Sequence, residues 1–248
     1  MTETTNWHVP ASHPPLLPGQ VHLWQLSLLA SPQQMAGYQP LLAQDEAEKA
    51  ARFHFARDRR RYTVARANLR RLLARYLQWD THAIRFAYGP QGKPSLQTDG
   101  ESPPLAFNIS HSGEIAILAF CLGGHIGVDV EEERALDDLP SLAASVFSQR
   151  ELADLHSLPP GQQPSGFYAC WTRKEAFIKA SGQGLSYPLK RFAVSLLPGE
   201  AARLVWVEGE VDAQARWQMA AFSPAPGYTG ALVVEGPPPA LSYWRCMG

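Results

Sequence analysis

Residues 123–131 read GGHIGVDVE, and this stretch decides how the chain is organised. The two glycines interrupt a run of strand-forming residues, and a new apolar strand follows them. Side chains alternate faces along a strand, so Asp129 and Glu131 point to one face and the valines beside them to the other. We therefore divide the chain here, into a half of residues 1–124 and a half of residues 125–248.

Helical and strand patterns alternate on both sides of this junction. Strands are predicted at 21–29, 84–88, 105–109, 115–121, 126–131, 192–196, 202–207, 218–222 and 228–234, and helices at 44–77, 139–147, 149–155 and 166–181. The strands at 105–109 and 115–121 are close enough to form a hairpin. This mixture is typical of an α+β fold, in which each half packs helices on an antiparallel sheet. Residues 1–20 are polar and proline-rich, and we expect a loose arm there.

Charge is unevenly distributed on a chain whose formal net charge is only -1. Ten of the 22 Lys and Arg residues lie between Lys49 and Arg75, whereas Asp129 to Asp138 holds six acids and one Arg. A neutral protein has no general attraction to nucleic acid or to an acidic membrane. A basic zone and an acidic zone together suit a ligand that carries phosphates and meets a metal ion.

The cysteines and the hydropathy pattern bear on where the protein works. Cys121, Cys170 and Cys246 are far apart and odd in number, which favours free thiols in a reducing cytoplasm. The first 20 residues lack the apolar core of a signal peptide. No stretch approaches the ~18 apolar residues of a membrane span. We therefore expect a cytoplasmic protein that binds no membrane.

A second acidic motif, WTRKEAFIK at 171–179, is followed by GQGL at 182–185. In a helix Trp171, Glu175 and Lys179 lie on one face. Together with the two strand carboxylates, Glu175 completes three oxygen donors of the kind that Mg²⁺ prefers. Each part also has a structural interpretation: the charges can form surface ion pairs, the aromatic residues can be core, and the glycines can cap the helix.

Three further features can present donors to an anion. FNISHS at 107–112 ends a strand in polar side chains, and GKP at 92–94 forms a tight loop around Lys93. The helix at 44–77 carries nine arginines, which cannot all share one face, so some are expected to be solvated or paired with Asp58. An ordinary turn explains each of the first two features equally well when it is taken alone.

The four motifs in this order resemble the 4′-phosphopantetheinyl transferase superfamily, specifically its larger Sfp-type enzymes. The similarity rests on GKP at 92–94, FNISHS at 107–112, GVDVE at 127–131 and the WTRKEA…GQGL motif at 171–185, and it covers roughly 44–194. It implies two similar, pseudo-symmetric α+β halves with the active site in the cleft between them. It also implies transfer of phosphopantetheine from coenzyme A to a serine of an acyl or peptidyl carrier protein, with Mg²⁺ as cofactor and adenosine 3′,5′-bisphosphate as leaving product.

The resemblance also assigns roles to individual residues. It implies catalytic roles for Asp129, Glu175 and Lys179, metal coordination by Asp129, Glu131 and Glu175, and coenzyme A contacts for Lys49, Arg52, Arg61, Lys93, Asn108, Ser110, His111, Lys174 and Lys179. Glu175 is thus a metal ligand, a general base or both. The basic positions of the long helix match the family less closely, because Glu46 stands where some relatives have a base.

Three other functions compete with this interpretation. The chain could bind coenzyme A or a carrier without catalysis, although a binder needs no set of three carboxylates. It could bind nucleic acid through the arginine-rich helix, which would make binding strongly salt-dependent. It could be a metal-dependent phosphohydrolase that needs no carrier. The sequence leaves open which carrier is modified and whether Mg²⁺ or Mn²⁺ works better; the Sfp-type length implies a monomer.

Overall fold

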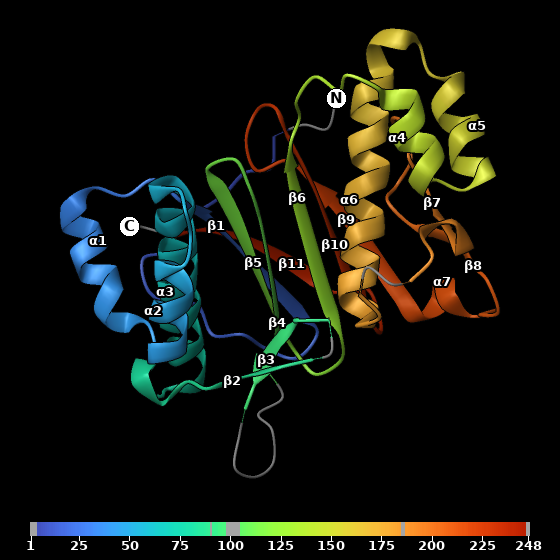
Figure 1. Ribbon diagram of the computed structural model, residues 1–248. Helices are drawn as coiled ribbons and strands as arrows, with labels where there is room; N and C mark the ends of the chain where they lie inside the picture. The colour runs from blue at the N-terminus through green and yellow to red at the C-terminus, as the bar shows by residue number, and fades with distance from the viewer. Residues whose placement is uncertain (1–3, 90, 98–104, 185–186, 247–248) are drawn as a thin grey trace.

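The structure is a computed structural model, and it describes residues 4–89, 91–97, 105–184 and 187–246 (Figure 1). Its architecture is α+β, as predicted. The elements are β1 Gln20–Ser27, α1 Pro32–Tyr38, α2 Gln44–Ala51, α3 Ala56–Leu77, β2 Phe86–Tyr88, β3 Pro94–Leu96, β4 Leu105–Ser112, β5 Ile115–Leu122, β6 Ile126–Glu132, α4 Leu139–Val146, α5 Gln149–Ser157, α6 Gln163–Ser181, β7 Phe192–Val194, β8 Leu204–Val207, α7 Ala213–Arg216, β9 Trp217–Phe222, β10 Tyr228–Glu235 and β11 Ala240–Arg245.

Two sheets, each covered by one long helix, form the body of the molecule (Figure 1). The first sheet has the strand order β11-β1-β5-β4 and packs against α3; the second has the order β6-β10-β9 and packs against α6. The predicted hairpin is confirmed by the antiparallel pairing of β4 with β5. The two halves are therefore similar in plan, with a helix on the outside and a sheet on the inside.

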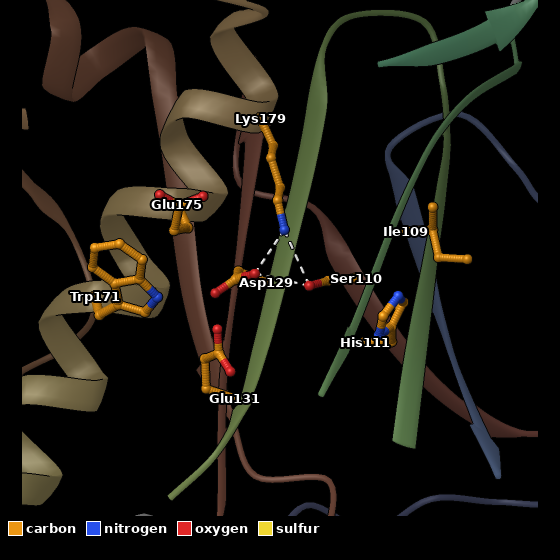
Figure 2. Close-up of a pocket in the computed structure, with 8 residues that line it drawn as sticks. All are labelled: Ile109, Ser110, His111, Asp129, Glu131, Trp171, Glu175 and Lys179. Carbon is orange, nitrogen blue, oxygen red and sulfur yellow. Dashed lines mark hydrogen bonds and ion pairs between the residues drawn. The ribbon is translucent and has the colours of Figure 1, made fainter. Parts of the chain in front are cut away.

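The two sheets pack against each other through a shared apolar layer. This central core contains buried side chains of β1 and β5 on one side and of β6 and β10 on the other. Val128 and Val130 are fully buried in it, so the alternation predicted for the acidic strand is confirmed. The opposite face of β6 carries Asp129 and Glu131, and it looks toward α6 (Figure 2).

The basic region at 44–77 is two helices rather than one, because the chain is not helical between Arg52 and Phe55. Two of its arginines are buried in α3, where Glu46 of α2 accepts hydrogen bonds from Arg66 and, at 2.5 Å, from Arg70. A buried guanidinium needs such a partner. The exposed Arg57 pairs with Asp58, as expected for the solvated part of the helix.

The expectation of a loose N-terminal arm is wrong. Trp7 is only 6% exposed, because its ring packs edge-on against Phe222 and Tyr243. His8 joins β11 through two main-chain hydrogen bonds, from its amide to the Tyr243 carbonyl and from the Arg245 amide to its own carbonyl. The arm therefore covers the free edge of β11.

Four elements follow no pattern that we recognised in the sequence: α1, β3, α7 and β11. The last of these is the strand after the proline run, and it pairs in parallel with β1, so the chain end returns to the first sheet. No helix among the described residues is long and apolar enough to cross a membrane.

Candidate active site

A pocket of about 300 Å³ lies between β4, β6 and α6 (Figure 2). It is lined by Ile109, Ser110, His111, Asp129, Glu131, Trp171, Glu175 and Lys179. Residues from both halves of the chain thus face one space. All of these side chains except Ile109 carry a polar atom. The pocket therefore suits a polar ligand.

Local geometry explains why these residues meet. The period of two places Asp129 and Glu131 on one face of β6, and the four-residue spacing places Trp171, Glu175 and Lys179 on one face of α6. The strand and helix can approach closely because residue 127 is glycine. A Cβ added to Gly127 would lie 2.1 Å from the Ala176 carbonyl oxygen.

Lys179 is held at the centre of the pocket by three oxygen atoms. Its ammonium donates to Oδ1 of Asp129 at 2.6 Å, to the hydroxyl of Ser110 at 3.0 Å and to the main-chain carbonyl of Val128 at 3.3 Å. Ser110 in turn donates to Oδ1 of Asp129 at 2.8 Å. The Lys179 ammonium is thus fixed beside the carboxylates and facing the pocket, where it could pair with an anion.

The carboxylates have unused acceptor capacity. Oδ2 of Asp129 and Oε1 of Glu175 are buried and have no hydrogen-bond partner in the part of the chain that the structure describes. Burial raises the pKa of Glu175, and the negative charge of Asp129 raises it further. Burial also raises the pKa of Glu131, which accepts a hydrogen bond from Ser112 at 2.7 Å that opposes the rise. Buried oxygens of this kind call for a positive partner.

These oxygens suit a hard divalent cation in number and kind. Asp129, Glu131 and Glu175 all line the pocket, and two of them present the unpartnered atoms just described. Among the described residues, however, no three His, Cys, Asp or Glu side chains are already gathered tightly enough to enclose a metal ion. A cation bound here would therefore need further ligands besides these three side chains.

His111 lies on the opposite wall from α6 (Figure 2). Burial lowers the pKa of the His111 imidazole, and the nearby cations Lys179 and Arg61 lower it further. A neutral imidazole can still donate one hydrogen bond to a phosphate oxygen. Arg61 itself is held by Glu114, whose carboxylate it meets at 2.8 Å.

Lys174 does not reach the pocket, so its expected contact with coenzyme A needs correction. It is fully buried on another face of α6, where its ammonium donates to both carboxylate oxygens of Glu151 at 2.7 and 2.8 Å. The carbonyl of Phe192 accepts its third hydrogen bond. All three protons of Lys174 are used, so a ligand could bind it only by breaking the interior.

Asn108 and Lys93 also lie outside the pocket lining. Asn108 is buried and accepts a hydrogen bond from the Val128 amide at 2.9 Å, which ties β4 to β6. The half-buried Lys93 donates to the carbonyls of Ile126, at 3.0 Å, and of Lys179. Burial lowers the pKa of Lys93 to about 8. Both side chains bond to the main chain of the elements that carry the carboxylates.

Lys49 and Arg52 are exposed at the end of α2. The Lys49 ammonium lies 5.5 Å from the centre of the Tyr62 ring, and the Arg52 guanidinium approaches the Glu48 carbonyl at 3.4 Å. Neither lines the pocket, and both are free to reach an extended ligand. Leu185, the last residue of the glycine-rich motif, lies outside the described residues.

Sequence reasoning assigned no site role to three residues that the structure places at or beside the pocket. Trp171 lines it, although the aromatic residues of its helix were also interpretable as core. Its spacing of four residues from Glu175 was the available signal. Ile109 lines the pocket and Ser112 orients Glu131, and both lie within the FNISHS motif.

Comparisons with known proteins point to one family. The family described as the 4′-phosphopantetheinyl transferase superfamily matches residues 125–233, and the 4′-phosphopantetheinyl transferase N-terminal family matches residues 29–122. The 4′-phosphopantetheinyl transferase HetI of Nostoc sp. is 35% identical over 221 residues, which cover 89% of this chain and 90% of HetI. A putative 4′-phosphopantetheinyl transferase of Synechocystis sp. is 39% identical over 60% of this chain and 61% of its own. The 4′-phosphopantetheinyl transferase Sfp of Bacillus subtilis is 35% identical over 64% of this chain and 68% of Sfp.

Proposed function

The chain belongs to the 4′-phosphopantetheinyl transferase superfamily, and from that membership we propose the reaction that its pocket performs. It is an enzyme that transfers phosphopantetheine from coenzyme A to a carrier protein. We propose that a serine hydroxyl of the carrier attacks the phosphorus next to the pantetheine arm. A P–O bond forms to that serine, the pyrophosphate P–O bond breaks, and adenosine 3′,5′-bisphosphate leaves.

One observation carries this proposal: three carboxylates, a lysine and a serine–histidine pair from both halves line a single pocket (Figure 2). A diphosphate ester needs its negative charge neutralised before an oxygen nucleophile can approach. Lysine and a carboxylate-bound cation together meet that need. The unpartnered oxygens of Asp129 and Glu175 support the presence of a cation, since buried carboxylate oxygens are otherwise bonded.

Mg²⁺ would be held by Asp129, Glu131 and Glu175, and when bound it would neutralise the diphosphate and polarise its oxygens. Lys179, whose side chain is partly exposed in the pocket, would place its positive charge beside the same diphosphate and beside the negative charge that grows on the leaving group. Ser110 and His111 would bind phosphate oxygens from the other wall. Asn108 would keep β4 and β6 in register, so that these two walls face each other.

Glu175 would be the general base. It is buried in the pocket and has a free oxygen, and its pKa is raised by burial and by Asp129, so it accepts a proton more readily than an exposed carboxylate. The proton of the attacking serine would pass to the Glu175 carboxylate oxygen that does not hold the cation. Asp129 would keep Lys179 in place for the reaction through its 2.6 Å ion pair.

Basic residues of the first half would hold the nucleotide end of coenzyme A. Arg61 influences the pKa of His111 and therefore lies near the pocket, whereas Lys49 and Arg52 are exposed on α2. We propose that these three meet the 3′-phosphate region. One family match ends at residue 122 and the other begins at residue 125, which supports a boundary at this place in the chain. We propose that residues 1–124 form the nucleotide-side half and residues 125–248 the metal-side half.

The carrier is an acyl, polyketide or peptidyl carrier protein, in which a serine sits on a small acidic helical domain. We propose that the enzyme works as a monomer in the cytoplasm, where its three free thiols would stay reduced. Neither nucleic acid nor a membrane has a role in the reaction.

The test is to incubate the full chain with coenzyme A, Mg²⁺ and an unmodified carrier, and to weigh the carrier by mass spectrometry. We expect the mass of one phosphopantetheine group to be gained, and the gain to vanish with a chelator and in Glu175→Gln and Asp129→Asn. Glu208→Gln, an exposed carboxylate on the second half, is the matched control and should keep full activity. Full activity of Glu175→Gln or Asp129→Asn would remove that residue from the site.

The competing functions give different results in the same assay. A coenzyme A binder without catalysis would leave fatty-acid, polyketide and peptide carriers all unmodified. A phosphohydrolase would cleave coenzyme A at an equal rate with and without a carrier.

A further inference from the structure

The β2–β3 hairpin crosses from the foot of α3 to the foot of β6, and it joins the two halves (Figure 1). We propose that this hairpin is a strut and that Lys93 is a positioning residue, which fixes the end of α6 so that Lys179 and Glu175 face the carboxylates of β6. The inference rests on the proposed function, because the residues that it positions are the ones to which we gave catalytic roles.

The strut is anchored to the first half at its base. Arg66 of α3 donates to the hydroxyl of Tyr88, and its guanidinium lies 3.9 Å from the centre of the Phe86 ring. Glu46 of α2 accepts from the same guanidinium and holds it in place. Phe86 and Tyr88 of β2 therefore both contact a guanidinium that a buried ion pair holds in place. These contacts fix the orientation of the hairpin relative to α3.

The other end of the strut bonds to the second half through Lys93. Its ammonium donates to the carbonyl of Lys179, in the last turn of α6, and to the carbonyl of Ile126, where β6 begins. The last carbonyls of a helix have no partner within the helix, and a cation at that end also interacts favourably with the negative end of the helix dipole. Lys93 therefore caps α6 from outside and joins its end to β6.

Two glycines allow this contact. Gly184 follows α6, and a Cβ there would lie 2.2 Å from Cγ of Gln91 in the hairpin turn. Gly127 is next to Ile126, and a Cβ there would lie 2.3 Å from the Ala180 amide nitrogen. Helix end, strand start and hairpin turn thus lie close together, with a glycine at each of the two near contacts. We therefore expect a shift of the turn to disturb the end of α6.

Lys179 connects this point to the chemistry. Its main chain is held by Lys93, while its ammonium, on the other side, bonds to Asp129 and Ser110. Without the cap, the last turn of α6 would fray and Lys179 would lose its fixed position. A displacement of about 1 Å in a catalytic group can lower a rate by about 100-fold.

The experiment separates positioning from direct contact with coenzyme A. In Lys93→Met we expect kcat to fall about 10- to 100-fold, while the Kd for coenzyme A, measured by calorimetry, changes less than about threefold. Lys93→Arg keeps two donors and should recover part of the rate. The exposed Lys190→Met, on the surface of the second half, is the matched control and should change neither quantity.

Hydrogen exchange provides a readout that does not depend on activity. The amides of residues 178–182 should exchange faster in Lys93→Met than in the parent chain and in Lys190→Met. This result would stand even if the assigned reaction were wrong, so the two proposals fail separately. Gly184→Ala perturbs the same junction without touching Lys93, and we expect the same loss of kcat with Kd preserved.

Two results would overturn the inference. A Kd for coenzyme A that rises tenfold or more in Lys93→Met, with kcat at saturation retained, would make Lys93 a direct ligand. Unchanged exchange at residues 178–182 in both Lys93→Met and Gly184→Ala would mean that the hairpin does not hold α6.

Discussion

Lys174 and Lys179 are five residues apart on one helix, and the structure gives them opposite environments. Lys179 reaches into the pocket and is 28% exposed, whereas Lys174 is fully buried against Glu151. Glu151 is saturated: besides Lys174 it accepts from the amides of Ser148 and Val194. The lysine of the WTRKEA motif therefore stabilises the packing of α5 and β7 on α6, beside the residue that we propose as general base.

Lys174→Met should strongly destabilise the protein. Removing one partner of a buried ion pair leaves an uncompensated charge and costs about 3–5 kcal/mol of the free energy of unfolding. Urea denaturation followed by circular dichroism measures this. The double variant Lys174→Met with Glu151→Leu should recover most of the loss, since an apolar pair can replace the ions.

The control for this variant is an exposed pair. Arg191 and Glu208 form an ion pair at 3.1 Å with side chains that are 63% and 60% exposed, and Arg191→Ala should cost less than about 1 kcal/mol. If Lys174→Met were no less stable than Arg191→Ala, Lys174 would not be the anchor described here.

The buried side chain of His22 should make the stability of the protein depend on pH. It is 2% exposed, and burial, followed by the nearby His13, lowers its pKa to about 4. An unfolded histidine titrates near 6.5, so between these values the unfolded state binds more protons. Stability should be full above pH 6.5 and fall by a few kcal/mol as pH drops toward 4.

Urea denaturation at pH 7.5, 6 and 5 tests this dependence. His22→Phe cannot titrate and should flatten the part of the curve that His22 contributes. The titratable groups that face His22 are His13, Tyr76, Arg75 and Cys246. Because the pKa of His13 is also lowered, stability should still depend on pH in His22→Phe, with a smaller slope. An identical slope in the parent chain and in His22→Phe would assign the acid sensitivity elsewhere.

At the scale of elements, the crossing of β6 and α6 determines the distance between the two acidic motifs. Gly127 permits the crossing, since a Cβ at this position would meet the main chain of α6 at Ala176 and Ala180. Gly127→Ala should therefore move α6 away from β6. We expect a loss of about 1–3 kcal/mol in stability and a fall of at least about tenfold in kcat.

Gly161→Ala is the matched control for that variant. A Cβ at Gly161 would have no atom of the described residues within 4 Å, so stability should change by less than about 0.5 kcal/mol and activity should be retained. Turnover and urea denaturation measured on both variants decide the matter. Equal behaviour of the two variants would show that close approach at Gly127 is unimportant.

Element patterns explain which parts of the fold were predictable. Strands β4, β5, β6 and β10 and helix α6 carry clear apolar periods, and their positions were predicted to within a few residues. The same periods made the two acidic motifs predictable. The two-residue period of a strand and the 3.6-residue period of a helix determine which side chains of each motif share a face. Periodicity cannot report a break such as Arg52–Phe55, where neither glycine nor proline interrupts the pattern.

Long-range contacts account for the rest. Nothing near Lys174 in the sequence indicates that Glu151 is its partner, and Lys93 reaches Lys179 over 86 residues. A lysine in a motif can bind a ligand or anchor the core, and its local sequence is the same in both cases. The loose arm was mispredicted for the same reason, since Trp7 is buried by Phe222 and Tyr243 from the far end of the chain.

At the scale of the whole molecule, the central core makes the halves interdependent. Buried residues of both sheets, among them Leu23, Ile117, Val128 and Leu232, belong to one apolar cluster. Strand β11 strengthens this dependence, because it lies at the end of the second half in sequence and pairs with β1 of the first sheet. We therefore expect both halves to unfold together in a single transition. The pocket is lined by residues of both halves, so it should be lost in the same transition.

Ending the chain at Pro239 tests this interdependence. The truncation removes β11, so β1 loses its parallel partner along Gln20–Gln25, and Trp7 loses the ring of Tyr243. Most of the direct damage falls on the first sheet, and Phe222 of β9 also loses its contact with the Tyr243 ring. Because the core is shared, the denaturation midpoint should still fall for the whole molecule, with far-ultraviolet and near-ultraviolet circular dichroism changing together. Arg245→Ala keeps the strand and should leave the midpoint nearly unchanged. Separate transitions for the two signals would mean that the halves are independent domains, and the pocket would then lie at an interface free to open.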